Sequence, residues 1–164
     1  AEEFLKLDDF DTILIDTGTG ISMNIMSFIA FSQEILIVTT PEPTSMTDAY
    51  GLLKVISELN LDRKVNVIVN RVSNKETALF TYERLKNTVE KFLNIKLEYL
   101  GYILDDMRVK NAVMDRKPLI QEYPDSIASK CLMAINDKMI ETNNQEIKLC
   151  TMSQVYNRLI KVFG

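Results

Sequence analysis

The amino-acid sequence predicts an α/β fold, with a mainly parallel sheet of about four strands flanked by helices. Two observations lead to this prediction: short β-branched runs recur along the chain, and the segments between them are long enough for helices. The predicted strands cover residues 12–15, 35–39, 65–69 and 99–104. The first two runs are almost continuous in apolar residues, which is typical of strands buried on both faces.

Apolar residues at intervals of three and four predict helices over residues 45–59, 75–92 and 125–139. The first of these opens with Ser45 and has Asp48 three positions later, as helix N-termini commonly do. A shorter helix over residues 107–114 would follow Asp106, whose carboxylate can cap it. The first two helices would each connect one parallel strand to the next and pack on the sheet.

Composition excludes several kinds of site. With 164 residues, of which 46% are hydrophobic and 26% charged, the chain has the size and apolar content of one globular domain. Because it contains no histidine, Ser-His-Asp triads, Cys-His dyads and His-containing metal sites are ruled out. Cys131 and Cys150 lack a C-x-x-C spacing, which favours reduced thiols. The net charge of −4 disfavours nucleic acid as a general partner.

The sequence also lacks the usual signals for export. No apolar stretch approaches the roughly 20 residues that cross a bilayer. The N-terminal string AEEFLKLDDF has neither the basic region nor the apolar core of a signal peptide. We therefore expect a cytoplasmic protein.

The clearest chemical pattern follows the first predicted strand. There the string FDTILIDTGTGI brings Asp16 to the carboxyl end of the strand, and a loop of Thr17, Gly18, Thr19 and Gly20 follows. In open α/β sheets ligands bind beyond the carboxyl ends of the strands, where a carboxylate can hold Mg²⁺ and glycines let backbone amides approach phosphate. A plain strand-turn would contain the same residues. The Asp-Thr-Gly site of aspartic proteases is excluded, since it needs a second copy and an all-β fold.

Polar residues also follow two later strands. Asn70 and Arg71 come after residues 65–69, and Asp105 and Asp106 come after residues 99–104. An Asn amide can pair with the acceptor and the donor on one edge of adenine, but it can equally bond to its own backbone in a turn. Asp106 has helix capping as its alternative role. Nothing else in the sequence supports Asp105 and Asp106 as paired catalytic carboxylates.

Three strings together, ILIDTGTGI, IVTTPEPTSMTDAYGLLK and VIVNRV, resemble the MinD/ParA group of deviant P-loop ATPases. Within that group the regulators of flagellar number and placement of the FlhG type are the most similar. The part from Thr40 to Tyr50 is the most diagnostic, and the resemblance covers about residues 10–140. It implies a partial P-loop NTPase domain from an ATP-dependent dimerisation switch that positions or counts a membrane-associated machine, the flagellum.

The resemblance also implies roles for individual residues. Asp16 would stand near Mg²⁺ in the Walker B position, and the next four residues would form the switch II loop. The nucleotide-dependent dimer face, or the side of the base, would hold Pro41, Glu42, Pro43 and Thr44. Adenine would lie between two groups of residues, Asn70 with Arg71 and Leu104 with Asp105 and Asp106. The intact protein would use ATP or ADP with Mg²⁺, form a homodimer and bind flagellar assembly factors.

One family element is missing. The sequence contains neither G-x-x-x-x-G-K-[ST] nor K-G-G-x-G-K-[ST], the loops whose lysines hold the phosphates. The chain also begins with Ala1 rather than Met, directly before the Asp16 strand. We therefore expect a C-terminal part of a longer ATPase that by itself binds no nucleotide and hydrolyses no ATP. The alternatives are a non-catalytic interaction module and a ParA-type DNA-partitioning ATPase, which the acidic charge disfavours.

The C-terminal residues follow a different pattern. After the domain over residues 1–140 we predict a polar linker over residues 141–150 and an amphipathic helix over residues 151–164. The apolar side of this helix contains Met152, Val155, Tyr156, Leu159, Ile160 and Phe163. Residues 147–164 carry basic but no acidic side chains, which suits an anionic membrane surface, and the family resemblance implies the same. The protein would then lie on the inner face of the cell membrane. The alternative is that this apolar side packs on its own domain.

Overall fold

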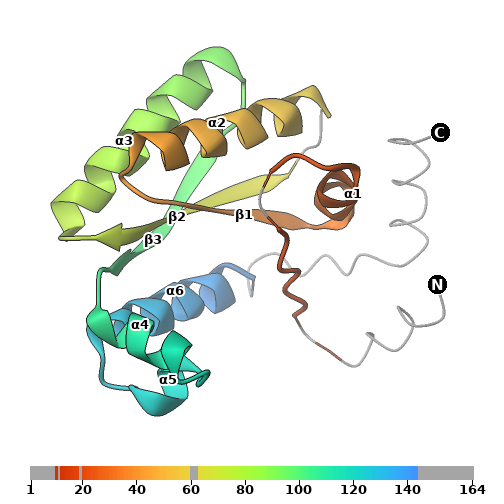
Figure 1. The fold of residues 1–164 in the computed structure, drawn as a ribbon. Coiled ribbons are helices and arrows are strands. Elements are labelled where there is room, and N and C mark those ends of the chain that lie inside the picture. The colour runs from red at the N-terminus through yellow and green to blue at the C-terminus, as the bar shows by residue number, and fades with distance from the viewer. Residues whose placement is uncertain (1–9, 11, 19, 60–62, 144–164) are drawn as a thin grey trace.

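The computed structural model describes residues 10, 12–18, 20–59 and 63–143. Over these residues the chain forms a parallel sheet with helices on both of its faces (Figure 1). The strand order is β1-β2-β3, with β1 at Glu34–Thr39, β2 at Lys64–Val72 and β3 at Leu97–Leu104. The predicted α/β class and parallel sheet are confirmed, and three of the predicted strands are present.

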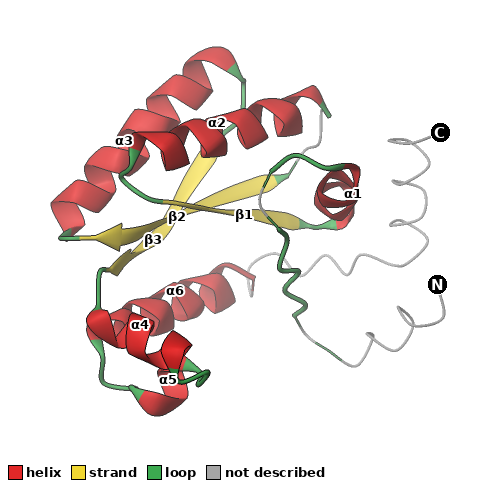
Figure 2. Cartoon of the chain, viewed as in Figure 1, coloured by secondary structure: helices red, strands yellow, loops and turns green. Residues whose placement is uncertain are grey.

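Helices lie before, between and after the strands (Figure 2). Their bounds are α1 Met23–Phe31, α2 Pro43–Glu58, α3 Lys75–Phe92, α4 Met107–Met114, α5 Leu119–Glu122 and α6 Ile127–Asn143. Helices α2 and α3 cover one face of the sheet, while α6 packs on the other face against β3 (Figure 1). Helices α4 and α5 contact each other, and the start of α4 is joined to the start of α6 through Asp106 and Ala128.

The main core lies between the sheet and the α2–α3 layer. The central strand β2 is almost continuously buried: Val65, Val67, Val69 and Val72 are each at most 2% exposed. Leu53 of α2 and Val89 of α3, both fully buried, pack into the same cluster. Each such side chain contributes about 1.5–3 kcal/mol by leaving water, so this layer supplies most of the apolar stabilisation.

A smaller cluster fixes α6 to the opposite face. It contains Ile68 of β2, Leu100 of β3 and Ile135 of α6. Gly101 of β3 allows this contact, because a Cβ atom there would come within 2.7 Å of the Ile135 Cγ1 atom. Non-bonded carbon atoms do not approach so closely. The absence of a side chain at Gly101 therefore lets the helix lie directly on the strand.

Side-chain caps start two of the helices where the sequence predicts them. The Asn74 Oδ1 atom accepts a hydrogen bond from the Thr77 amide at 2.8 Å and begins α3. The Asp106 carboxylate accepts from the Arg108 amide at 2.9 Å and begins α4, and it also accepts from the Ala128 amide of α6 at 3.4 Å. These donors favour the charged carboxylate, so the pKa of Asp106 lies below its usual value, with the Arg108 amide as the largest cause. The predicted bounds of both helices are confirmed.

The predicted strand over residues 12–15 is wrong. Ile13, Leu14 and Ile15 are 49%, 76% and 41% exposed and belong to no strand. A strand must exchange backbone hydrogen bonds with a neighbour, and among the described residues β1 pairs only with β2. An apolar β-branched run without a partner stays irregular.

The prediction that β1 is buried on both faces is also wrong. Ile35 and Ile37 are buried under the α2 side, but Leu36 is 40% and Val38 is 55% exposed. The reason is that α6 packs over β3 and leaves this face of β1 open in the described part of the chain.

The bounds predicted for α2 and α6 need correction, since α6 begins at Ile127 rather than at residue 125, and α1 and α5 were not predicted. Helix α2 begins at Pro43 with Glu42 as its N-cap, and Ser45 lies in its first turn. Pro43 suits the first helical position because that residue needs no amide hydrogen. Helix α1 was not predicted because MNIMSFIAF is apolar nearly throughout and has no helical periodicity, and α5 is only four residues long.

The C-terminal predictions fall mostly outside the described residues. Helix α6 continues to Asn143, three residues into the predicted linker. Residues 144–164, with all the apolar residues of the predicted membrane helix, lie outside the described part of the chain. Among the residues that are described, no helix is both long and apolar enough to cross a bilayer.

Truncation of a core leucine tests this packing. Leu53→Ala removes a side chain that is 0% exposed, so we expect the free energy of unfolding to fall by about 3 kcal/mol. Leu14→Ala, at a position that is 76% exposed, should change it by less than about 0.5 kcal/mol. Urea denaturation of the 164-residue chain measures both values. A large loss in Leu14→Ala would show that residues 12–15 are packed after all.

Removal of the Asp106 charge tests the shared cap. Because the folded-state pKa is lowered, the charged carboxylate stabilises the fold above the unfolded-state pKa of about 4, and this stabilisation is lost as the pH falls through the folded-state value. Asp106→Asn should therefore be less stable than the parent at neutral pH, and the difference should shrink below about pH 4. Urea midpoints measured across this pH range check the prediction. Asp105→Asn, at a side chain that caps neither helix, is the matched control.

Candidate functional site

The carboxyl ends of the three strands meet at one edge of the sheet. The register pairs Thr39 with Val69 and Val72 with Leu104, so the turns that follow β1, β2 and β3 lie next to one another. This edge contains the residues predicted for the dimer face and for adenine: Pro41, Glu42, Pro43, Thr44, Asn70, Arg71, Leu104, Asp105 and Asp106. We refer to these turns together as the carboxyl edge.

The end of β2 is irregular at the predicted base-binding pair. The register between β2 and β3 shifts between Val69 and Val72, which leaves Asn70 and Arg71 as a bulge. Arg71 has φ of 55°, a left-handed conformation that costs a non-glycine residue roughly 1–2 kcal/mol. The Asn70 Oδ1 atom accepts a hydrogen bond from the Arg71 amide at 2.8 Å and supports this conformation. Bulges of this kind redirect side chains next to functional sites.

Only one of the two polar groups of the Asn70 side chain is therefore hydrogen-bonded within the described part of the chain. Its oxygen makes the bond to its own backbone that turn residues commonly make, as the alternative interpretation predicted. Its amide nitrogen has no hydrogen bond to another described residue, and its oxygen retains a second lone pair. Both groups remain available to a ligand at the carboxyl edge.

Hydroxyl groups hold the turn between β1 and α2. The Ser45 Oγ atom accepts a hydrogen bond from the Thr40 amide at 3.0 Å and lies 3.1 Å from the Thr39 Oγ1 atom. The Thr40 hydroxyl donates to the Glu42 Oε2 atom at 2.6 Å. The sequence prediction did not assign these roles to Thr39, Thr40 and Ser45. The diagnostic string contains Thr40 and Ser45, and Ser45 was expected only as the start of the following helix.

One ion pair connects the two turns. The Glu42 Oε1 atom lies 3.8 Å from the Arg71 Nη1 atom, and both side chains are more than half exposed. Exposed pairs of this kind typically stabilise a fold by less than about 1 kcal/mol. The contact therefore contributes little to the stability of the fold, and its main effect is to set the relative positions of the Glu42 and Arg71 side chains.

Hydrogen bonds connect the turn after β3 to strand β2 and to the starts of α4 and α6. The Asp105 amide donates to the Val72 carbonyl oxygen at 2.9 Å, which joins this turn to the bulge of β2. The Asp106 carboxylate is used by the starts of α4 and α6, so its predicted capping role is confirmed. Leu104 and Asp105 are thereby placed beside Asn70 and Arg71, and their contact with a base stays a prediction.

The predicted magnesium and switch residues follow residues 12–15, which form no strand in this structure. Asp16, Thr17 and Gly18 are exposed and belong to no helix or strand. Thr19 lies outside the described residues. Gly20 has φ of 95° and turns the chain toward Ser22, the N-cap of α1. Because residues 12–15 form no strand here, the pairing that was expected to bring Asp16 to the carboxyl edge is absent from the described part of the chain, and the role of Asp16 stays a prediction. The described residues contain no group of three His, Cys, Asp or Glu side chains that could hold a metal ion.

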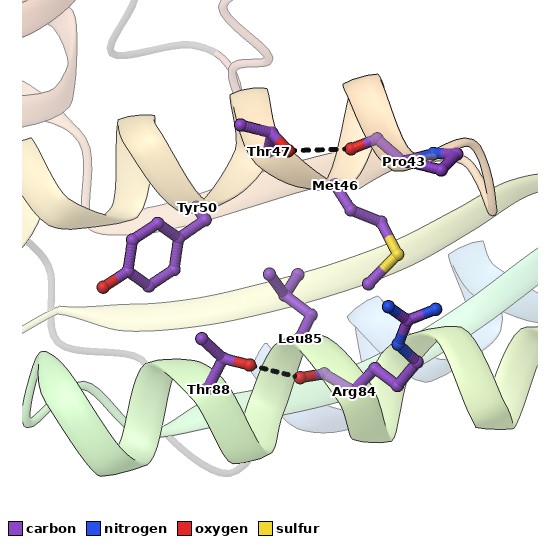
Figure 3. Close-up of a pocket in the computed structure, with 7 residues that line it drawn as sticks. All are labelled: Pro43, Met46, Thr47, Tyr50, Arg84, Leu85 and Thr88. Atoms are coloured by element: carbon purple, nitrogen blue, oxygen red, sulfur yellow. Dashed lines mark hydrogen bonds between the residues drawn. The ribbon is translucent and has the colours of Figure 1, made fainter.

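A separate groove of about 270 Å³ lies between α2 and α3 (Figure 3). It is lined by Pro43, Met46, Thr47, Tyr50, Arg84, Leu85 and Thr88. The two threonine hydroxyls donate to carbonyl oxygens of their own helices, Thr47 to Pro43 at 2.9 Å and Thr88 to Arg84 at 2.9 Å. The two hydroxyls are therefore bonded within their own helices, and the remaining polar side chains of the lining are Tyr50 and Arg84, whose guanidinium lies 5.7 Å from the centre of the Phe80 ring.

No family model matches the chain, but individual proteins do. It is 31% identical over 132 residues to the antiactivator FleN of Pseudomonas aeruginosa, covering 80% of this chain and 47% of that protein. It is 33% identical over 162 residues to the flagellum site-determining protein YlxH of Helicobacter pylori, covering 96% of this chain and 54% of that protein. The chain thus spans about half the length of the curated relatives it matches.

A solved structure shows the same fold. The septum site-determining protein MinD of Pyrococcus horikoshii, in complex with Mg-ADP, superposes with a TM-score of 0.67 at 21% identity. The match covers 90% of this chain and 58% of that protein. The diagnostic strings, the parallel sheet and these relatives agree with one another, and the chain therefore belongs to the MinD/ParA family of P-loop ATPases, with similarity to its flagellar site-determining members.

Proposed function

We propose that this chain forms the base side of the nucleotide site in an ATP-dependent dimerisation switch that positions or counts flagella. The observation that carries the proposal is the meeting of the β1–α2 turn, the Asn70–Arg71 bulge and the Leu104–Asp105 turn at one edge of the sheet. In parallel α/β sheets this is the edge where nucleotides bind. The name of one matched relative, the flagellum site-determining protein YlxH, supports the flagellar part of the proposal.

The groups at the carboxyl edge fit adenine. An adenine edge presents a ring nitrogen that accepts beside an amino group that donates. The free Asn70 amide nitrogen can donate to the ring nitrogen, and the second lone pair of its oxygen can accept from the amino group. Guanine presents a carbonyl oxygen where adenine has the amino group, so the same side chain in the same orientation would reject it.

The remaining roles are proposals that depend on further contacts. Bound ATP supplies the γ-phosphate that distinguishes the two states of such a switch. Asp16 and the loop that follows it would hold the magnesium ion and sense this phosphate, which requires residues 12–15 to pair with a strand that the described residues do not contain. Pro41, Glu42, Pro43 and Thr44, at the start of α2, would form the homodimer face. Lacking a phosphate-binding loop, the 164-residue chain by itself would not hydrolyse ATP.

Membrane attachment is proposed for the C-terminal residues. A single short amphipathic helix binds a membrane weakly, so two helices in an ATP-dependent dimer would couple the nucleotide state to attachment by avidity. The dimer would then act on flagellar assembly factors at the inner face of the cell membrane.

Deletion of the proposed membrane helix tests this part. Removal of residues 151–164 should abolish co-sedimentation of the protein with vesicles that contain anionic lipids, because the apolar side chains and the basic charge are both lost. Vesicles of neutral lipid provide the comparison for the charge contribution. Unchanged co-sedimentation after the deletion would remove the basis for this proposal.

Substitution of Asn70 tests the base site. In the product of the complete reading frame, Asn70→Ala should weaken ATP binding about tenfold, since two hydrogen bonds to the base are lost. Weak GTP binding should not change, so discrimination between the two nucleotides falls. Competition with a fluorescent ATP analogue measures both affinities. Asn87→Ala, at an exposed position on α3, is the matched control. An unchanged ATP affinity in Asn70→Ala would place the base elsewhere.

A further inference from the structure

We infer that Glu42 is a positioning residue, which holds the Arg71 side chain and through it the bulge that presents Asn70 to the base. The inference rests on the proposed function, because it concerns how the same site is kept in its binding geometry. Glu42 lies before α2 and Arg71 lies at the end of β2, so their contact joins two turns that are far apart in the sequence.

The first observation is that the Glu42 side chain does not cap the helix that it precedes. Glu42 is the N-cap residue of α2, a position where the short side chains of Ser, Thr, Asp or Asn accept from the free amides of the first turn, and the longer Glu side chain is not among those that favour this role. The Glu42 side chain makes no such bond. Its carboxylate instead points toward Thr40 and Arg71.

The second observation is that the turn fixes the direction of this carboxylate. Thr40 donates its hydroxyl hydrogen to the Glu42 Oε2 atom at 2.6 Å, and the Thr40 amide is itself bound by the Ser45 hydroxyl at 3.0 Å. One Glu42 oxygen is thus anchored, and the other lies 3.8 Å from the Arg71 guanidinium. An anchored carboxylate loses less side-chain entropy when it forms an ion pair than a free one does.

The third observation is that the bulge needs support. Arg71 holds a left-handed conformation that a non-glycine residue rarely adopts, and such conformations persist only where surrounding contacts maintain them. The backbone contact is the bond from the Arg71 amide to Asn70. The side-chain contact is the pair with Glu42, so a loss of this pair would loosen the segment that also orients the Asn70 amide.

A double-mutant cycle in the product of the complete reading frame tests the inference. Glu42→Gln and Arg71→Gln should each weaken ATP binding about two- to fivefold, the size of effect that an exposed pair can transmit. The double variant should bind no worse than either single variant, because both remove the same contact. At about 1 M salt the effect of Glu42→Gln should disappear, since an exposed pair is then screened. The urea midpoint should stay unchanged in all variants, and Glu90→Gln on the far part of α3 is the control.

The outcomes separate this inference from the proposed function. If Asn70→Ala weakens ATP binding but Glu42→Gln does not, the base site stands and the positioning role of Glu42 is overturned. If the effects of Glu42→Gln and Arg71→Gln add, the two residues act independently and the inference is also overturned. If Asn70→Ala leaves ATP binding unchanged, the proposed base site fails and the inference fails with it. Non-additive effects that vanish at high salt establish the positioning role.

Discussion

The parallel pairing of β2 with both of its neighbours is the constraint on which the rest of the structure depends. Because β2 is buried along nearly its whole length, its valines hold α2 and α3 on one face, while Ile68 holds α6 on the other. Parallel pairing also aligns the carboxyl ends of the strands, so three turns from distant parts of the sequence meet. The chemistry of the carboxyl edge is therefore a consequence of how the core is packed.

The residues of the proposed site lie where the regular structure is interrupted. Arg71 departs from strand geometry, and Glu42 precedes a helix that it does not cap. By contrast, the carboxylate of Asp106 accepts hydrogen bonds from backbone amides at the starts of two helices, α4 and α6. The Asp106 carboxylate is thereby held by the fold, whereas the Asn70 amide nitrogen has no hydrogen bond to another described residue. Asn70 is therefore the better candidate of the two for contact with a ligand at this edge.

Local signals in the sequence predicted the local parts of the fold. Helices α3 and α4 have the expected bounds because Asn74 and Asp106 are side-chain caps, and caps depend on neighbours three residues away at most. The run over residues 12–15 failed because a strand also depends on a distant partner, and this non-local requirement leaves no trace in the run itself. For the same reason the family strings identified Glu42 and Arg71 one by one, but only the folded chain shows that they form a pair.

The open side of β1 has a consequence for the behaviour of the chain in solution. One edge of β1 offers unpaired backbone groups among the described residues, and the adjacent face exposes Leu36 and Val38. An uncovered edge beside an apolar face is a template for adding strands from other molecules, and no proline or lysine interrupts β1 to prevent it. We therefore expect the chain to self-associate through β1 at high concentration unless another strand or helix covers this edge.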